Sequence, residues 1–232
     1  EIQNFSSFPQ EVFNDQQVRL TLELINEGDT NAENVAARLF NVPFESDTGS
    51  NNNVWKLDDS RTISFDTLQA ADEENNLPAR EKNKYWTMTS PDLGNGVTIP
   101  YQFMTRIYYK YQTRGTSSIT LMDQQRFREE GTTERPELDT TSGPVQMQIR
   151  TQSPIVFYPE DEGDRQTEMC VVVKNDGEGT PFLHSEAYED GDYDVKKEAS
   201  NKVKLRVPDQ GGIEFAPEDG SGNTAVVEMF GN

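Results

Sequence analysis

The clearest pattern in the chain is a strict alternation of apolar and polar side chains near its beginning. Within residues 16–28, the apolar residues Val18, Leu20, Leu22 and Leu24 recur at every second position, with polar residues between them. This period of two is that of a β-strand with one face in a core and the other in water. The run ends in Asn26-Glu27-Gly28, and Asn and Gly turn the chain at low steric cost. We therefore predict a strand followed by a tight turn.

A second stretch repeats this design. Residues 165–177 place Met169, Val171 and Val173 at alternate positions, where the first stretch has leucines. Asn175 and Gly177 then follow at the spacing of the Asn and Gly in the first turn. We interpret the two stretches as one module used twice.

Similar patterns predict further short strands in both halves of the chain. In the first half they cover residues 8–14, 34–40, 54–57, 62–68, 85–89, 97–111 and 117–122. In the second half they cover residues 145–149, 154–158, 182–188, 203–207, 213–215 and 225–230. No helical period persists, and short strands at this spacing are typical of antiparallel sandwiches. The predicted fold is all-β, with two tandem Ig-like antiparallel β-sandwich domains joined by a short acidic linker.

The linker is predicted from composition. Residues 129–143 are rich in Glu, Thr and Pro and have no periodicity, which is typical of an exposed connector. The predicted organisation is an Ig-like sandwich over residues 1–128, the linker over 129–143, and a second sandwich over 144–232. Because the second module stops abruptly at Asn232, we expect it to lack its last strand or to take one from elsewhere.

Net charge narrows the possible partners. The 232 residues include 21 Lys and Arg but 41 Asp and Glu, which gives a formal net charge of -20. Such a surface argues against nucleic acid and anionic membranes, since both require basic side chains. Membrane insertion is not expected, since no apolar run approaches the ~18 residues needed to span a bilayer. Two explanations stay open: a high-salt habitat, where salt screens the repulsion, or binding of divalent cations.

The best candidate for a cation site is an acidic loop in the second module. Asp190, Asp192 and Asp194 occupy alternate positions, so their carboxylates could converge on one Ca²⁺. The loop is not an EF-hand, because Val195 stands at the position that requires glycine. The competing interpretation is a hydrated acidic turn, and beyond this Ca²⁺ no cofactor is expected.

Residues for catalysis are scarce. The single histidine, His184, has no second histidine to complete a zinc set, and the only cysteine is Cys170. Carboxylate pairs such as Asp58/Asp59 and Glu73/Glu74 arise by chance among so many acidic residues. We therefore predict that the protein is not an enzyme.

Two observations point to carbohydrate. Trp55, Trp86 and the tyrosines around Tyr108 could stack on sugars, although large aromatics in sandwiches more often fill the core. Tyr108 is singled out as a ligand-binding candidate, because it leaves the apolar face of its predicted strand. Asn4-Phe5-Ser6 is the only N-glycosylation sequon, so Asn4 is a candidate glycan attachment site if the protein is exported.

The first module also resembles a known family. The turn at residues 26–30, the following Ala-Glu-Asn-Val-Ala-Ala-Arg-Leu run, residues 85–91 and residues 106–111 are similar to CARDB modules, the Ig-like domains of prokaryotic surface proteins. The resemblance covers most of residues 8–125 and reaches the second module more distantly, through residues 154–180. Acidic tandem copies resemble extracellular proteins of halophilic archaea.

The resemblance has implications for function. It implies a cell-surface or extracellular filament protein of structural or adhesive function, without catalytic residues, whose partners are copies of itself or other surface proteins. We expect it to self-associate through β-sheet edges, which present unpaired backbone groups. The alternative is a glycan-binding or accessory module of a larger surface protein.

Overall fold

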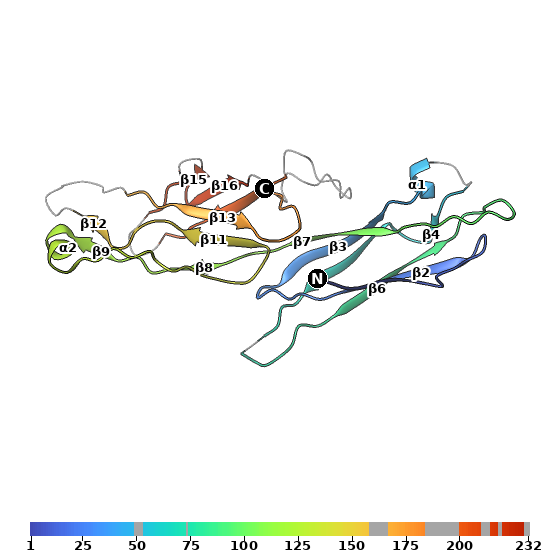
Figure 1. Cartoon of the computed structure of the whole chain (residues 1–232), viewed down its shortest axis with the longest axis horizontal. Coiled ribbons are helices and arrows are strands. Elements are labelled where there is room, and N and C mark those ends of the chain that lie inside the picture. The colour runs from blue at the N-terminus through green and yellow to red at the C-terminus, as the bar shows by residue number, and fades with distance from the viewer. Residues whose placement is uncertain are drawn as a thin grey trace. The chain divides into compact units, whose positions relative to one another are not determined.

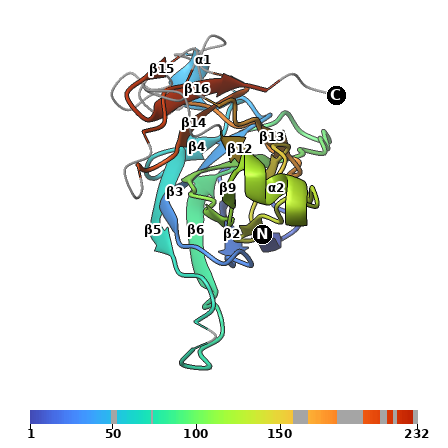
Figure 2. The ribbon, with the colours of Figure 1, turned by 90° about the vertical axis from the view of Figure 1, so that its left-hand side faces the viewer.

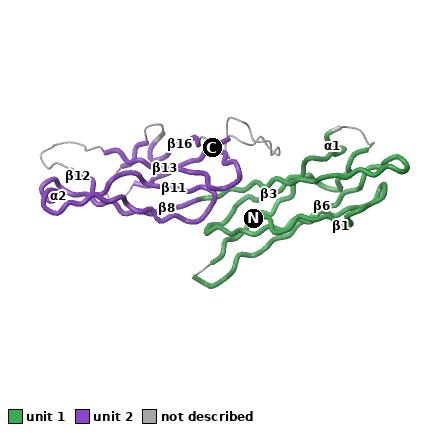
Figure 3. Tube along the Cα trace, in the orientation of Figure 1, with its two compact units in different colours: residues 1–112 green, residues 113–232 purple. Residues whose placement is uncertain are grey.

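The computed structural model describes residues 1–48, 53–72, 74–157, 167–183, 200–209, 214–217 and 220–229. The chain divides into two compact units, Glu1–Gln112 and Thr113–Asn232 (Figure 3). Strands predominate in both units, and the described residues contain only two short helices. The prediction of an all-β protein is confirmed.

Unit 1 consists of two antiparallel sheets (Figure 1). Its strands are β1 (Ile2–Phe8), β2 (Gln17–Leu24), β3 (Ala32–Phe40), β4 (Lys56–Leu57), β5 (Thr62–Leu68), β6 (Lys82–Thr89) and β7 (Met104–Lys110), with a short helix α1 (Glu45–Thr48). One sheet has the order β1-β2-β6-β4, and the other has the order β5-β3-β7. The predicted strands over residues 16–28 and 62–68 are confirmed as β2 and β5.

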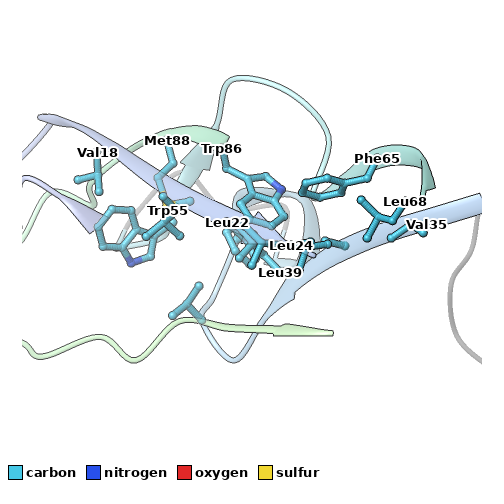
Figure 4. Close-up of a cluster of buried hydrophobic side chains, with 14 of the residues drawn as sticks. Val18, Leu22, Leu24, Val35, Leu39, Trp55, Phe65, Leu68, Trp86 and Met88 are labelled. Atoms are coloured by element: carbon cyan, nitrogen blue, oxygen red, sulfur yellow. The ribbon is translucent and has the colours of Figure 1, made fainter. Parts of the chain in front are cut away.

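The hydrophobic core of unit 1 receives side chains from both sheets (Figure 4). Leu22 from β2 and Met88 from β6 come from the first sheet, and Leu39 from β3 and Phe65 from β5 come from the second; all four are at most 1% exposed. Each such side chain contributes about 1.5–3 kcal/mol when it leaves water. Unit 1 is therefore β-sandwich-like.

Unit 2 is divided among smaller sheets. Its elements are β8 (Gly115–Thr116), β9 (Leu121–Asp123), α2 (Gln124–Glu130), β10 (Asp139–Thr140), β11 (Val145–Ile149), β12 (Ile155–Phe157), β13 (Val171–Asn175), β14 (Lys202–Arg206), β15 (Gly220–Ser221) and β16 (Thr224–Glu228). β8 pairs with β10, β11 with β13, and β16 with both β14 and β15. β9 pairs with β12 in parallel, a departure from the antiparallel prediction, and α2 lies beside both strands (Figure 2).

Burial differs strongly between the units. Of the twenty buried hydrophobic residues in the described ranges, only Leu183 and Met229 belong to unit 2. The apolar side chains of β11 and β13 are half-buried rather than buried. Two-stranded sheets of this kind are marginally stable by themselves.

The predicted internal repeat is borne out at the turn that follows β2 and β13. In the first copy, the Asn26 Oδ1 atom accepts from the Gly28 N–H at 3.1 Å, and Nδ2 donates to the Thr30 carbonyl at 2.8 Å. In the second copy, Asn175 Oδ1 accepts from the Gly177 N–H at 3.2 Å, and Nδ2 donates to the Gly179 carbonyl at 2.8 Å. The same two bonds therefore recur at the same spacings.

Two strand predictions in unit 1 are wrong, and in unit 2 residues 117–120 and 214–215 form no strand. Residues 9–14 form bends and turns, and the first strand is β1, since Pro9 has no N–H for a ladder. The predicted strand over residues 97–111 is formed only as β7. Pro100 interrupts its early part, where Tyr101 and Phe103 pack edge-on against Trp55 with ring centroids 5.4 and 4.9 Å apart.

The boundary between the units also differs from the expected one. Residues 129–143 were predicted as a linker, but Asp139 and Thr140 pair with Thr116 and Gly115. The structure therefore divides the chain after Gln112, and the expected linker belongs to unit 2. Helix α2 was not predicted; it begins after Asp123, whose carboxylate accepts from the Arg126 N–H at 3.0 Å.

Candidate functional site

The candidate site is the outer edge of β1, which is the end strand of the four-stranded sheet. Its sequence, Ile-Gln-Asn-Phe-Ser-Ser-Phe, contains no charged residue, in a chain that carries a formal charge of -20. Phe5 anchors the strand, because its ring packs edge-on against Trp86 at 6.4 Å between centroids. Phe8 is 79% exposed at the end of the strand.

The hydrogen bonds of β2 determine which β1 groups point outward. The Gln16 carbonyl accepts from the Ser90 N–H, which lies on the side of β6. The Ile25 N–H, in contrast, donates to the Glu1 carbonyl, which lies on the side of β1. Because bonding sides alternate along a strand, Arg19, Thr21 and Glu23 bond to β1.

The register of the two strands completes the assignment. Phe8, Ser6 and Asn4 lie opposite these three residues, so their backbone groups face β2. The N–H and C=O groups of Phe5 and Ser7 then point away from the sheet. No hydrogen bond joins these four groups to any other described residue. They form the open edge.

Side chains of β6 bridge the two sheets at β5, the end strand of the second sheet. The Trp86 indole N–H donates to the Arg61 carbonyl at 3.0 Å, and the Lys82 ammonium donates to the Phe65 carbonyl at 3.1 Å. These bonds connect β6 to β5 and to the residue before it. Asp66 in β5 adopts φ 59°, and β3 and β5 shift register beside it. Bulges and lysines of this kind discourage strand addition.

Asn4 lies in the middle of β1. It is exposed and faces the opposite side of the sheet from the anchor Phe5. A glycan on Asn4 would therefore project from the outer face of the sheet, without disturbing the core.

The aromatic residues proposed for sugar stacking are buried in the structure. Trp55, Trp86 and Tyr108 are each at most 4% exposed. Trp55 and Trp86 belong to the core of unit 1, and Tyr108 lies opposite Ala36 in the sheet ladder. No ring face of these three residues is open to a ligand.

Several predicted residues lie outside the described ranges. They include the Ca²⁺ candidates Asp190, Asp192 and Asp194, together with His184 and Glu73. Asp58, Asp59 and Cys170 are described and exposed. Within the described ranges, no group of three or more acidic, His or Cys side chains is arranged to hold a metal ion. No helix there is both long and apolar enough to cross a membrane.

The importance of β1 could not be found from alternation. Its apolar residues Ile2, Phe5 and Phe8 are spaced three apart, which matches neither a strand nor a longer helix. The ladder explains the spacing, because an irregularity between Ile2 and Asn4 places both Ile2 and Phe5 opposite inward-facing leucines of β2. The feature of the sequence that distinguishes β1 is that it contains no charged residue.

Comparisons with protein-family models, with curated proteins and with solved structures find no match to this chain. The class that fold and site define is an all-β protein whose first unit is β-sandwich-like and has an open, uncharged edge strand.

Proposed function

We propose that this chain is a non-enzymatic structural or adhesive protein of a cell surface or extracellular filament, and that its copies associate by β-strand addition at β1. The observation that carries the proposal is the open edge of β1. Four backbone groups there have no partner within the described residues, on a strand without a charged side chain. Such an edge is a template for another strand, because its main-chain groups give affinity to any extended segment.

Architecture supports the rest of the proposal. In support of an Ig-like assignment, β1, β2 and β6 share one sheet, and β3 and β7 share the other. Kinship with CARDB modules is part of the proposal and depends on the sequence motifs alone. The weakly buried strands of unit 2 offer a surface that would gain from pairing with another copy.

A proline in the edge provides the test. In Ser7→Pro, the outward N–H is replaced by a ring carbon, which blocks an incoming strand but leaves the bonds to β2 intact. Ser7→Ala removes the same hydroxyl and keeps the N–H, so it is the matched control. Ser6→Lys, which adds a charge beside the edge, is a second variant that does not restrict the backbone.

Sedimentation velocity and negative-stain electron microscopy measure the outcome. Wild type and Ser7→Ala are expected to form oligomers or filaments, and Ser7→Pro and Ser6→Lys to stay monomeric with unchanged circular dichroism. A monomeric wild-type protein at high concentration and high salt would overturn the proposal. Assembly of both edge variants at the wild-type level would also reject it.

A further inference from the structure

We infer that the outer face of the four-stranded sheet binds a neutral, hydroxyl-rich polysaccharide, with Tyr85 as its stacking platform. This inference is independent of strand addition, since it concerns the face of the sheet rather than its edge.

The face is defined by the ladder. Val18, Leu20, Leu22 and Leu24 of β2 and Trp86 and Met88 of β6 point into the core, so the alternate positions of both strands point outward. Strand pairing brings twelve outward side chains together in four rows that run across the sheet. The first row contains Lys56, Thr89 and Gln17, and the second contains Thr87, Arg19 and Phe8. The third row contains Tyr85, Thr21 and Ser6, and the fourth contains Asn83, Glu23 and Asn4. All of them are exposed or half-exposed, so no described element covers the face.

The chemistry of the face suits sugars. Eight of the twelve side chains, Tyr85 among them, carry a hydroxyl or an amide, which can both donate and accept hydrogen bonds. Two are aromatic: Tyr85 is 54% exposed and Phe8 is 79% exposed. Aromatic rings provide flat apolar surfaces for the C–H faces of pyranoses, and the polar groups around them match sugar hydroxyls.

Tyr85 is held in position for this role. The guanidinium of Arg19 lies over its ring at 4.3 Å from the centroid, a cation–π contact that restrains the ring. Tyr85 and Phe8 are two strands and two residues apart, which corresponds to about 12 Å at ~4.8 Å between strands and ~3.4 Å per residue. That separation suits an extended polymer, which could contact both rings at once.

Charge selects the occupant. Among the twelve side chains only Lys56, Arg19 and Glu23 are charged. At the margin of the face, the Asp58 carboxylate accepts from the Gln17 amide at 3.3 Å, which brings the net charge there to zero in a chain of -20. An acidic polysaccharide would bring a large negative charge toward a protein of the same sign. A neutral polymer experiences no such repulsion. The face is therefore matched to a neutral glycan.

Affinity electrophoresis of the full chain tests the inference, with soluble mannan, hydroxyethyl cellulose or dextran in the gel and alginate as the acidic comparison. Tyr85→Ala is expected to weaken retardation by about tenfold, as for loss of an aromatic anchor. Tyr85→Phe keeps the ring and should bind as wild type does. Tyr109→Ala removes a half-exposed tyrosine from the other sheet and is the matched control.

Each outcome decides the question. Retardation by a neutral polysaccharide that is lost in Tyr85→Ala and kept in Tyr85→Phe and Tyr109→Ala supports the inference. No retardation by any of the three neutral polymers overturns it, as does retardation by alginate alone or binding that is unaffected in Tyr85→Ala. Because Tyr85 is not on the edge, Tyr85→Ala should leave the oligomer distribution of the wild type unchanged, so failure here is distinguishable from failure of strand addition.

Discussion

Replacing Asn26 with alanine removes the side chain that closes the end of β2. Asn26 is 7% exposed, and its amide nitrogen donates to two carbonyls, those of Thr30 at 2.8 Å and Leu68 at 3.0 Å. Its oxygen accepts from the Gly28 N–H at 3.1 Å. Each of the three bonds contributes about 0.5–1.5 kcal/mol, and the buried Leu68 carbonyl is left without this donor. The expected loss in the free energy of unfolding is about 3 kcal/mol.

The repeat supplies a matched control. Asn175 makes the corresponding two bonds, but it is only half-buried and, among the residues that the structure describes, has no counterpart to the bond with Leu68. We therefore expect Asn175→Ala to cost only about 1 kcal/mol.

Urea unfolding is the assay for both variants. Tryptophan fluorescence reports unit 1, because Trp55 and Trp86 are the only tryptophans and both lie in its core. Circular dichroism follows the whole chain and covers Asn175→Ala. A cost below about 1 kcal/mol for Asn26→Ala would refute the reasoning, since it would mean that the buried carbonyl does not depend on the amide. Equal losses in the free energy of unfolding for the two variants would show that burial of the turn does not affect its contribution to stability.

Two further changes probe unit 1. A Cβ atom at Gly28 would lie 2.1 Å from the Tyr111 hydroxyl oxygen, so Gly28→Ala should cost about 1–3 kcal/mol of stability, as expected for overpacking. In thermal unfolding, the Gly28→Ala/Tyr111→Phe double variant should lose less than the sum of the single variants, and strict additivity would contradict the clash. Burial raises the pKa of the Tyr109 phenol, with a smaller contribution from Tyr111. The folded state therefore holds this proton more tightly than the unfolded state, and stability should fall as the pH rises past about 10, the ordinary tyrosine pKa. Tyr109→Phe should lessen that fall, and an ultraviolet titration in which every tyrosine ionises at the ordinary pKa would exclude the effect.

Strands with regular alternation could be predicted closely from the sequence. β5 and β11 have the predicted bounds, and β2 differs by little, because one apolar residue in two specifies a half-buried strand. The turn repeat was also predictable, since Asn and Gly act through bonds to residues two and four positions away. These interactions are local and leave a readable pattern.

Features that depend on distant partners could not be predicted in this way. The irregularity in β1 disrupts the alternation of apolar and polar residues that would identify a strand. Helix α2 has only Phe127 as an apolar residue, so its sequence shows no apolar stripe at helical spacing. β10 pairs with β8 through only two residues of each strand. The polar composition of residues 129–143 gives no sign of so short a pairing. Tyr85 was predicted as a strand residue, but its place on an open face follows only from the ladder.

The uncharged edge has a consequence for the response to ionic strength. Contacts made by backbone groups and uncharged side chains of β1 are not weakened by dissolved ions, whereas repulsion between two chains of charge -20 is screened beyond ~10 Å at 0.1 M salt. An association through β1 would therefore strengthen as salt is added, the reverse of an interface built on ion pairs. Dilution into fresh water would then be a disassembly signal that requires no dedicated sensor residue.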